Sequence, residues 1–217
     1  MAKLSIFRHA ESIYGSEIYA GNVDIPLSSK GIKQAMALST VVGALAPDIV
    51  YTSKLIRAME TALLMLANME KRVTRIYPNE LDSVILSQGF LPLIEFNALN
   101  ERNYGELQNK SKKQVLELYS PEDIQRWRRG FYMAPPEGES FSDVVERVRE
   151  FMFSNIYPYI ENNNILVVAH QNTMRAFYYL LMNQSPEKIE SIEFFNCEGI
   201  QFDFENSKMV GFSIIKP

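Results

Sequence analysis

The chain has 217 residues, of which 47% are hydrophobic and 22% charged, and this is the composition of a soluble globular protein with a sizeable core. A formal net charge of −4 argues against a nucleic-acid partner or an anionic membrane surface, although a local arginine cluster could still bind a small anion. A single cysteine excludes an intrachain disulfide, and no apolar stretch is long enough to span a bilayer. We therefore expect a cytoplasmic protein, either a monomer or a homo-oligomer.

Predicted strands and helices alternate along the chain. Apolar and β-branched runs predict strands, and apolar residues at three- and four-residue steps predict helices. Ser53 and Ser120 are the expected N-caps of two of these helices. In chain order we expect a strand at 3–9, a helix at 28–47, a strand at 49–53, a helix at 53–69, a strand at 73–77, helices at 120–130 and 140–160, a strand at 165–170, helices at 173–182 and 185–192, and strands at 199–204 and 211–215.

This alternation predicts an α/β fold with a mostly parallel sheet covered on both faces. Residues 78–100 are less regular and are expected to form an insertion over one end of the sheet. No linker, repeat or low-complexity segment divides the chain, so residues 1–217 are expected to form a single domain.

The chain has only two histidines, and each ends a predicted strand. His9 ends the apolar part of "LSIFRHAES", His170 ends "NILVVAH", and Arg57 lies just past a third strand. Ligand groups in α/β proteins gather at the carboxyl edge of the sheet. We therefore expect these three side chains to meet there.

Such a cluster would suit covalent phosphoryl transfer. A neutral imidazole can act as the nucleophile, and His9 with Arg8 beside it is the candidate. Fixed cations and N–H donors must stabilise the phosphoryl oxygens, for which Arg57 and His170 are available. Glu101, after a loop, could exchange protons with the leaving and incoming oxygens.

Structural interpretations of the same residues remain open. A lone histidine is usually structural, and Arg57 could form a surface ion pair with Glu11 or Glu60. The helix macrodipole favours Arg128 and Arg129 in a last turn whatever the function. The other candidates could belong to a solvated face or to the core: Lys110, Lys112, Lys113 and Tyr104. Nucleotide-binding glycine loops, zinc-ligand spacing and a nucleophile-elbow serine are all missing from the sequence.

Five motifs in order, "FRHAES", "LNERNYGELQNKSK", "WRRGF", "PPEGES" and "VVAHQNTMRA", resemble the cofactor-dependent (2,3-bisphosphoglycerate-dependent) phosphoglycerate mutases of the histidine phosphatase superfamily. The resemblance extends from residue 3 to about residue 205. It implies a three-layer α/β/α sandwich and interconversion of 3-phosphoglycerate and 2-phosphoglycerate through a phosphohistidine. The primer would be 2,3-bisphosphoglycerate, and no metal is implied.

By this resemblance His9 is the phosphorylated nucleophile, Arg8, Arg57 and His170 hold the phosphoryl group, and Glu101 is the proton shuttle. The resemblance also implies a set of residues that bind the rest of the substrate: Gly21, Tyr104, Lys112, Arg128, Arg129 and Asn172.

The sequence departs from the mutase pattern at four positions, where the family has glycine, asparagine, threonine and glycine: Ala10, Gly15, Ala20 and Gln171. Gly15 and Ala20 lack polar side chains that would contact the substrate. The chain also ends at Pro217, without the long tail that shields the phosphoenzyme from water in many mutases. These features favour a phosphomonoesterase as the alternative. A catalytically idle domain that binds phosphorylated ligands is a third possibility, and the retained charged residues argue against it.

Overall fold

In a computed structural model, which describes residues 1–85 and 89–216, seven strands form one mixed sheet in the order β3-β4-β2-β5-β1-β6-β7. The first five strands in this order are parallel to one another, and β6 and β7 are antiparallel additions at one edge. The strands are β1 Ala2–Arg8, β2 Ile49–Ser53, β3 Arg72–Arg75, β4 Phe90–Phe96, β5 Ile165–Ala169, β6 Gly199–Glu205 and β7 Lys208–Ile215.

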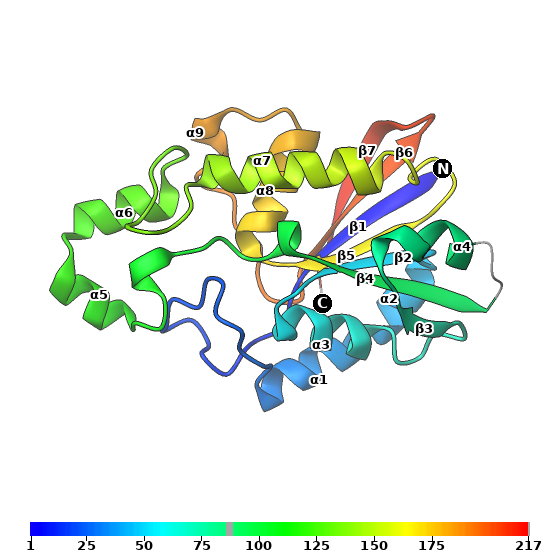
Figure 1. The fold of residues 1–217 in the computed structure, drawn as a ribbon, viewed down its shortest axis with the longest axis horizontal. Helices are drawn as coiled ribbons and strands as arrows, with labels where there is room; N and C mark the ends of the chain where they lie inside the picture. Colours follow the sequence, from blue (N-terminus) through cyan, green and yellow to red (C-terminus); the bar gives the residue numbers. More distant parts are fainter. Residues whose placement is uncertain (86–88, 217) are drawn as a thin grey trace.

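Helices cover both faces of this sheet, with α7 and α8 on one side and α1 and α3 on the other (Figure 1). The α-helices are α1 Ser29–Ala37, α2 Ser39–Leu45, α3 Ile56–Met65, α4 Leu81–Ile85, α5 Lys112–Leu118, α6 Pro121–Arg129, α7 Phe141–Phe151, α8 Gln171–Leu181 and α9 Pro186–Ile189. Short 3-10 helices occur at Pro78–Glu80, Asn97–Leu99 and Gly105–Leu107, and a π-helical turn at Met152–Ile156.

Two hydrophobic cores, one on each face of the sheet, hold the layers together. Successive residues of β5 point to opposite faces, so Ile165 and Val167 join the core under α7 and α8, while Leu166 and Val168 join the core under α1 and α3. All five residues of β5 are buried and none is polar, as expected for a strand at the centre of a parallel sheet. The predicted three-layer α/β/α sandwich is confirmed.

Several predicted boundaries are wrong. The helix expected at 28–47 is divided at Leu38 into α1 and α2. Ser53 is not an N-cap, because α3 begins three residues later and the Ser53 side chain hydrogen-bonds elsewhere. By contrast, Ser120 caps α6 as predicted, and Gly130 ends it.

The prediction of an insertion at 78–100 is wrong for residues 90–96. These residues form β4, an interior strand between β3 and β2. Pro92 hides this strand in the sequence, because a proline within an apolar run argues against an interior strand. Pro92 pairs with Thr74 of β3 on one side. On the other side, pairing with β2 begins only at Leu93, so no residue of β2 is paired with Pro92, and its missing N–H is tolerated. The expectation for 86–88 falls outside the described residues.

The sheet order determines where the functional loops meet. Because β1, β2 and β5 are adjacent and parallel, the segments that follow Arg8, Ser53 and Ala169 leave the same edge of the sheet. Within the described ranges, no helix is both long enough and apolar enough to cross a bilayer.

Candidate active site

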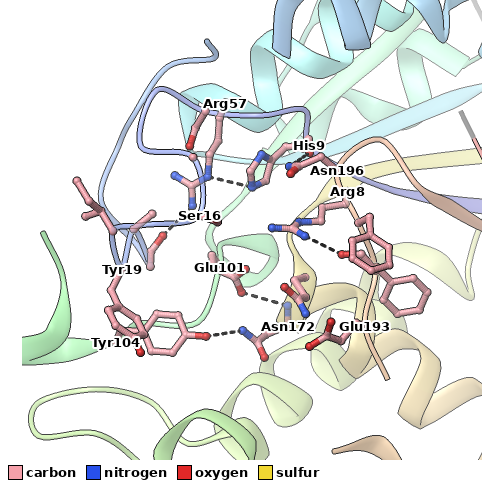
Figure 2. A pocket seen from close by; sticks show the side chains of 18 of the residues that line it. Arg8, His9, Ser16, Tyr19, Arg57, Glu101, Tyr104, Asn172, Glu193 and Asn196 are labelled. Atoms are coloured by element: carbon pink, nitrogen blue, oxygen red, sulfur yellow. Dashed lines mark hydrogen bonds between the residues drawn. The ribbon is translucent and has the colours of Figure 1, made fainter. Parts of the chain in front are cut away.

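A cavity of about 420 Å³ opens at this edge of the sheet. Ten of the residues predicted from the sequence line it, and Figure 2 shows several of them pointing toward one another. They are Arg8, His9, Gly21, Arg57, Glu101, Tyr104, Lys112, Arg128, Arg129 and Asn172. The eleventh, His170, is fully buried beneath the cavity.

Two hydrogen bonds determine the protonation state of His9. Its Nδ1 lies 2.6 Å from the carbonyl oxygen of Ala10, which can only accept, so Nδ1 carries a proton. The Arg57 Nε–H donates to His9 Nε2 at 3.3 Å, so Nε2 must present a lone pair. Burial, with the positive charges of Arg57 and Arg8, also lowers the pKa of His9 well below its usual value. His9 is therefore neutral at physiological pH, and Nε2 is free to act as a nucleophile.

Arg57 is held rigidly below the cavity surface. Its Nη1 and Nη2 donate to the carbonyl oxygens of Val23 and Gly21, at 2.8 Å and 2.7 Å. Burial lowers the pKa of Arg57 to about 10, which still leaves it cationic at neutral pH. Since Arg57 is 1% exposed and Glu11 pairs with Lys30 instead, the surface-salt-bridge interpretation of Arg57 is excluded.

Arg8 lies on the other side of His9, and not all of its N–H donors have an acceptor. Its Nη1 donates to the carbonyl oxygen of Phe194 at 2.7 Å, but its buried Nε has no hydrogen-bond partner. An unpaired guanidinium donor is costly in a buried position. Arg8 lines the cavity beside His9, so its guanidinium is a candidate to bind an anion there.

Glu101 faces the same cavity from the loop after the Asn97–Leu99 turn (Figure 2). Its Oε1 accepts hydrogen bonds from the backbone N–H groups of Arg102 and Asn172, at 2.8 Å and 3.2 Å. These bonds orient the carboxyl group, as expected of a group that must exchange a proton in a defined direction.

Three further cationic side chains line the cavity, from elements other than those that carry His9 and Arg57; the part of the wall that they form is called the cationic end below. Lys112, at the start of α5, and Arg128 and Arg129, at the end of α6, line it together. Asn172 Nδ2 donates to the hydroxyl of Tyr104 at 3.1 Å beside them. This end of the cavity can bind a second anionic group of a ligand whose first group contacts His9.

His170 packs against His9 from below, with the two ring centroids 4.9 Å apart. Its Nε2 lies 2.7 Å from the Ser53 hydroxyl, and its buried Nδ1 has no hydrogen-bond partner. Burial and the charge of Arg57 lower the pKa of His170 well below its usual value. The structure therefore brings the two histidines together, as predicted.

Three of the four departures from the mutase pattern lie on the cavity wall: Gly15, Ala20 and Gln171. Gly15 has a φ of +55°, and a Cβ added there would meet no atom within 4 Å. Ala10 is buried, and its backbone N–H donates to the Thr61 hydroxyl at 3.0 Å.

Several residues that the structure places in the site were given no role there by the sequence analysis, among them Ser53, Arg175, Glu193 and Asn196. Arg175 donates to the side-chain oxygen of Asn172, and its position one helical turn after Asn172 is the signal that could have identified it. Glu193 forms an ion pair with Arg129, and Asn196 donates to the backbone oxygen of His9 at 2.8 Å. Both follow α9 in irregular backbone, where no periodicity indicates the direction of a side chain.

Comparison with known proteins identifies the class to which this fold and site belong. The family model of the histidine phosphatase superfamily (branch 1) matches residues 4–78 and 82–212, and the chain belongs to this superfamily. The chain is also 35% identical, over 225 residues and 96% of each sequence, to the 2,3-bisphosphoglycerate-dependent phosphoglycerate mutase of Chlamydia pneumoniae.

Solved structures show the same fold at lower identity. Bacillus stearothermophilus YhfR superposes with a TM-score of 0.80 at 20% identity, covering 97% of this chain and 95% of its own. The alpha-ribazole phosphatase of Shigella flexneri superposes with a TM-score of 0.75 at 24% identity, covering 95% and 93%. At these identities the likeness shows the fold, which this chain therefore shares with a protein named as a phosphatase.

Proposed function

We propose that this protein is a phosphoglycerate mutase that interconverts 3-phosphoglycerate and 2-phosphoglycerate through a phosphohistidine at His9. The supporting observation is the pair of anion-binding regions in one cavity, one around His9 and one at Lys112, Arg128 and Arg129. A plain phosphomonoesterase needs only the first region. A phosphoglycerate has a carboxylate for the second, and the identity to the Chlamydia pneumoniae mutase supports the same substrate.

In the proposed reaction, His9 Nε2 attacks phosphorus and the bond to the leaving oxygen breaks. Arg8 and Arg57 stabilise the charge on the phosphoryl oxygens, and His170 supplies a further donor. Glu101 protonates the leaving oxygen and later removes the proton from the hydroxyl that attacks phosphohistidine. Phosphorylated His9, once loaded by the primer, donates its phosphoryl group to the free hydroxyl of the bound phosphoglycerate, and His9 Nε2 is then rephosphorylated from the other position of the bisphosphate so formed.

The site fits 2,3-bisphosphoglycerate as the primer. When bound, this compound supplies the phosphoryl group that loads His9. Its further phosphate and carboxylate would lie against the side chains at the cationic end, and the unpaired Nε of Arg8 would gain an acceptor. We assign no metal to the reaction. We further propose that residues 1–217 act as one domain, monomeric or homo-oligomeric, in cytoplasmic glycolysis and gluconeogenesis.

An isomerase assay with and without 2,3-bisphosphoglycerate tests this function. We expect the two phosphoglycerates to interconvert only after priming, with an acid-labile, base-stable phosphate on the protein. His9→Gln should abolish both the label and turnover, because it removes the imidazole nitrogen that accepts the phosphoryl group. Release of inorganic phosphate and glycerate without isomerisation would contradict the proposal.

A phosphomonoesterase is the second candidate, because Gly15 and Ala20 present no polar side chain to the cavity. Loss of such contacts would slow transfer to the bound phosphoglycerate and leave phosphohistidine open to water. A screen of phosphate release from diverse monoesters separates the two activities. Release that is negligible beside mutase turnover would eliminate the hydrolase.

A further inference from the structure

Ser53 and His170 form a hydrogen-bonded pair at the base of the site, and neither side chain reaches solvent. The Ser53 oxygen lies 2.7 Å from His170 Nε2 and accepts the backbone N–H of Leu55 at 3.2 Å. His170 Nδ1, the other ring nitrogen, is buried without a partner. The position of the imidazole proton is therefore determined by what Ser53 can donate and accept.

If the proton were on Nε2, it would be donated to Ser53. The Ser53 oxygen would then accept two N–H groups, and its own hydroxyl proton would have no acceptor among the hydrogen bonds of the described residues. His170 Nδ1 would in addition present a buried lone pair without a donor. This tautomer leaves two buried polar groups unsatisfied.

If the proton is on Nδ1, the Ser53 hydroxyl donates to Nε2 and its oxygen accepts from Leu55, so both groups of this pair are satisfied. Only the Nδ1–H remains unpaired. The His170 ring lies beside the His9 ring, with 4.9 Å between centroids, and its Nε2 is occupied by Ser53, so the unpaired Nδ1–H is the group of His170 that could donate to an anion attached to His9. The opposite tautomer would present a lone pair to that anion and repel it.

We propose that Ser53 is a positioning residue that selects the Nδ1–H tautomer of His170 and so makes this ring a hydrogen-bond donor to the phosphoryl group. The tautomer follows from the geometry of the pair alone. Its consequence for turnover rests on the proposed function.

Nuclear magnetic resonance of protein labelled with ¹⁵N-histidine tests the tautomer directly, because the chain has only two histidines. In His9→Gln only the signals of His170 remain, and this assigns them. We expect a protonated Nδ1 and an unprotonated Nε2 in otherwise unaltered protein. A protonated Nε2 would overturn the inference, whatever the activity of the enzyme proves to be.

Ser53→Ala should shift the His170 signals toward protonated Nε2, and it should lower kcat by roughly tenfold or more with a smaller change in KM. Ser53→Thr, which retains the hydroxyl, should restore the Nδ1–H signals and most of kcat. Thr52→Val is the matched control, because the Thr52 hydroxyl is equally buried but donates to the backbone oxygen of Ser53. Unchanged His170 signals in folded Ser53→Ala would overturn the inference. If Ser53→Ala shifts the His170 signals as expected but the unaltered protein does not turn over phosphoglycerate, only the proposed function is contradicted.

Discussion

At the scale of single residues, Glu193 places a negative charge at the cationic end of the cavity. It forms an ion pair with Arg129, and the arginines there lower the pKa of its carboxyl. A substrate carboxylate binding at the same end must compete with Glu193 for Arg129 and approach its negative charge. We therefore expect Glu193 to weaken the binding of acidic substrates.

We expect Glu193→Gln to lower the KM for 3-phosphoglycerate by roughly two- to fivefold, the size of one partly exposed ion pair. Steady-state kinetics measure this change, and Glu187→Gln, on the exposed side of α9, is the charge-matched control. A higher KM in Glu193→Gln would show instead that Glu193 holds Arg129 in its binding position.

Gly15 offers a second test at this scale. Asparagine tolerates positive φ better than most residues, and a Cβ at Gly15 meets open space, so Gly15→Asn should fold normally. The new amide would donate to the substrate, which is worth on the order of 1.5–3 kcal/mol for a charged acceptor. We expect the ratio of mutase to phosphatase turnover to rise by roughly tenfold. Gly43→Asn, on α2 away from the cavity, serves as a control, and an unchanged ratio in Gly15→Asn would refute a role for this position.

At the scale of elements, the start of α7 depends on one serine. Ser140 is nearly buried, its hydroxyl accepts the backbone N–H of Asp143 at 3.2 Å, and the Asp143 carboxylate accepts the Ser140 N–H at 2.8 Å. This reciprocal arrangement is a capping box, and α7 covers one face of the sheet.

Ser140→Ala should lower the free energy of unfolding by about 1–2 kcal/mol, because it removes the buried hydroxyl that accepts the Asp143 N–H and hydrogen-bonds the Asp143 carboxylate. Urea denaturation measures the loss. The same substitution at Ser120, an exposed cap of α6, should cost less, since water can replace the hydroxyl there. Equal losses at the two caps would contradict the importance of burial.

Elements were predicted well wherever local signals agreed. The bounds of β2 are as predicted, since its five residues are rich in β-branched side chains and lie between a helix and a loop. The interior strand β4 was missed because Pro92 argues against a strand, and only its neighbours in the sheet show how proline is tolerated. Ser53 was assigned a capping role for a similar reason, because its partner His170 is remote in sequence.

At the scale of the whole molecule, the two buried histidines couple stability to pH. Burial and nearby arginines lower both pKa values well below the unfolded value of about 6.5. Above that value neither state binds a proton at these rings. As the pH falls through 6.5, the unfolded chain takes up protons that the native state does not, so the native state loses stability.

We expect the free energy of unfolding to fall below pH 6.5 by up to about 1.4 kcal/mol per pH unit for each histidine. Urea denaturation between pH 8 and 5.5, in a buffer without phosphate, measures the slope. His9→Gln should remove about half of the histidine contribution, and comparison with this variant cancels the titration of carboxylates. An identical slope in His9→Gln would show that His9 is protonated in the native state.

The sequence by itself determined the alternating elements, the capping of α6, and the residue types of the site, because periodicity and composition are local properties. Tertiary structure alone decided which strands are neighbours. Pairing of β1 with β5 brings His9 and His170 together, and the position of β2 beside β5 places Ser53 beneath them. Strand order depends on long-range packing of two cores on one sheet, which no short segment of the chain encodes.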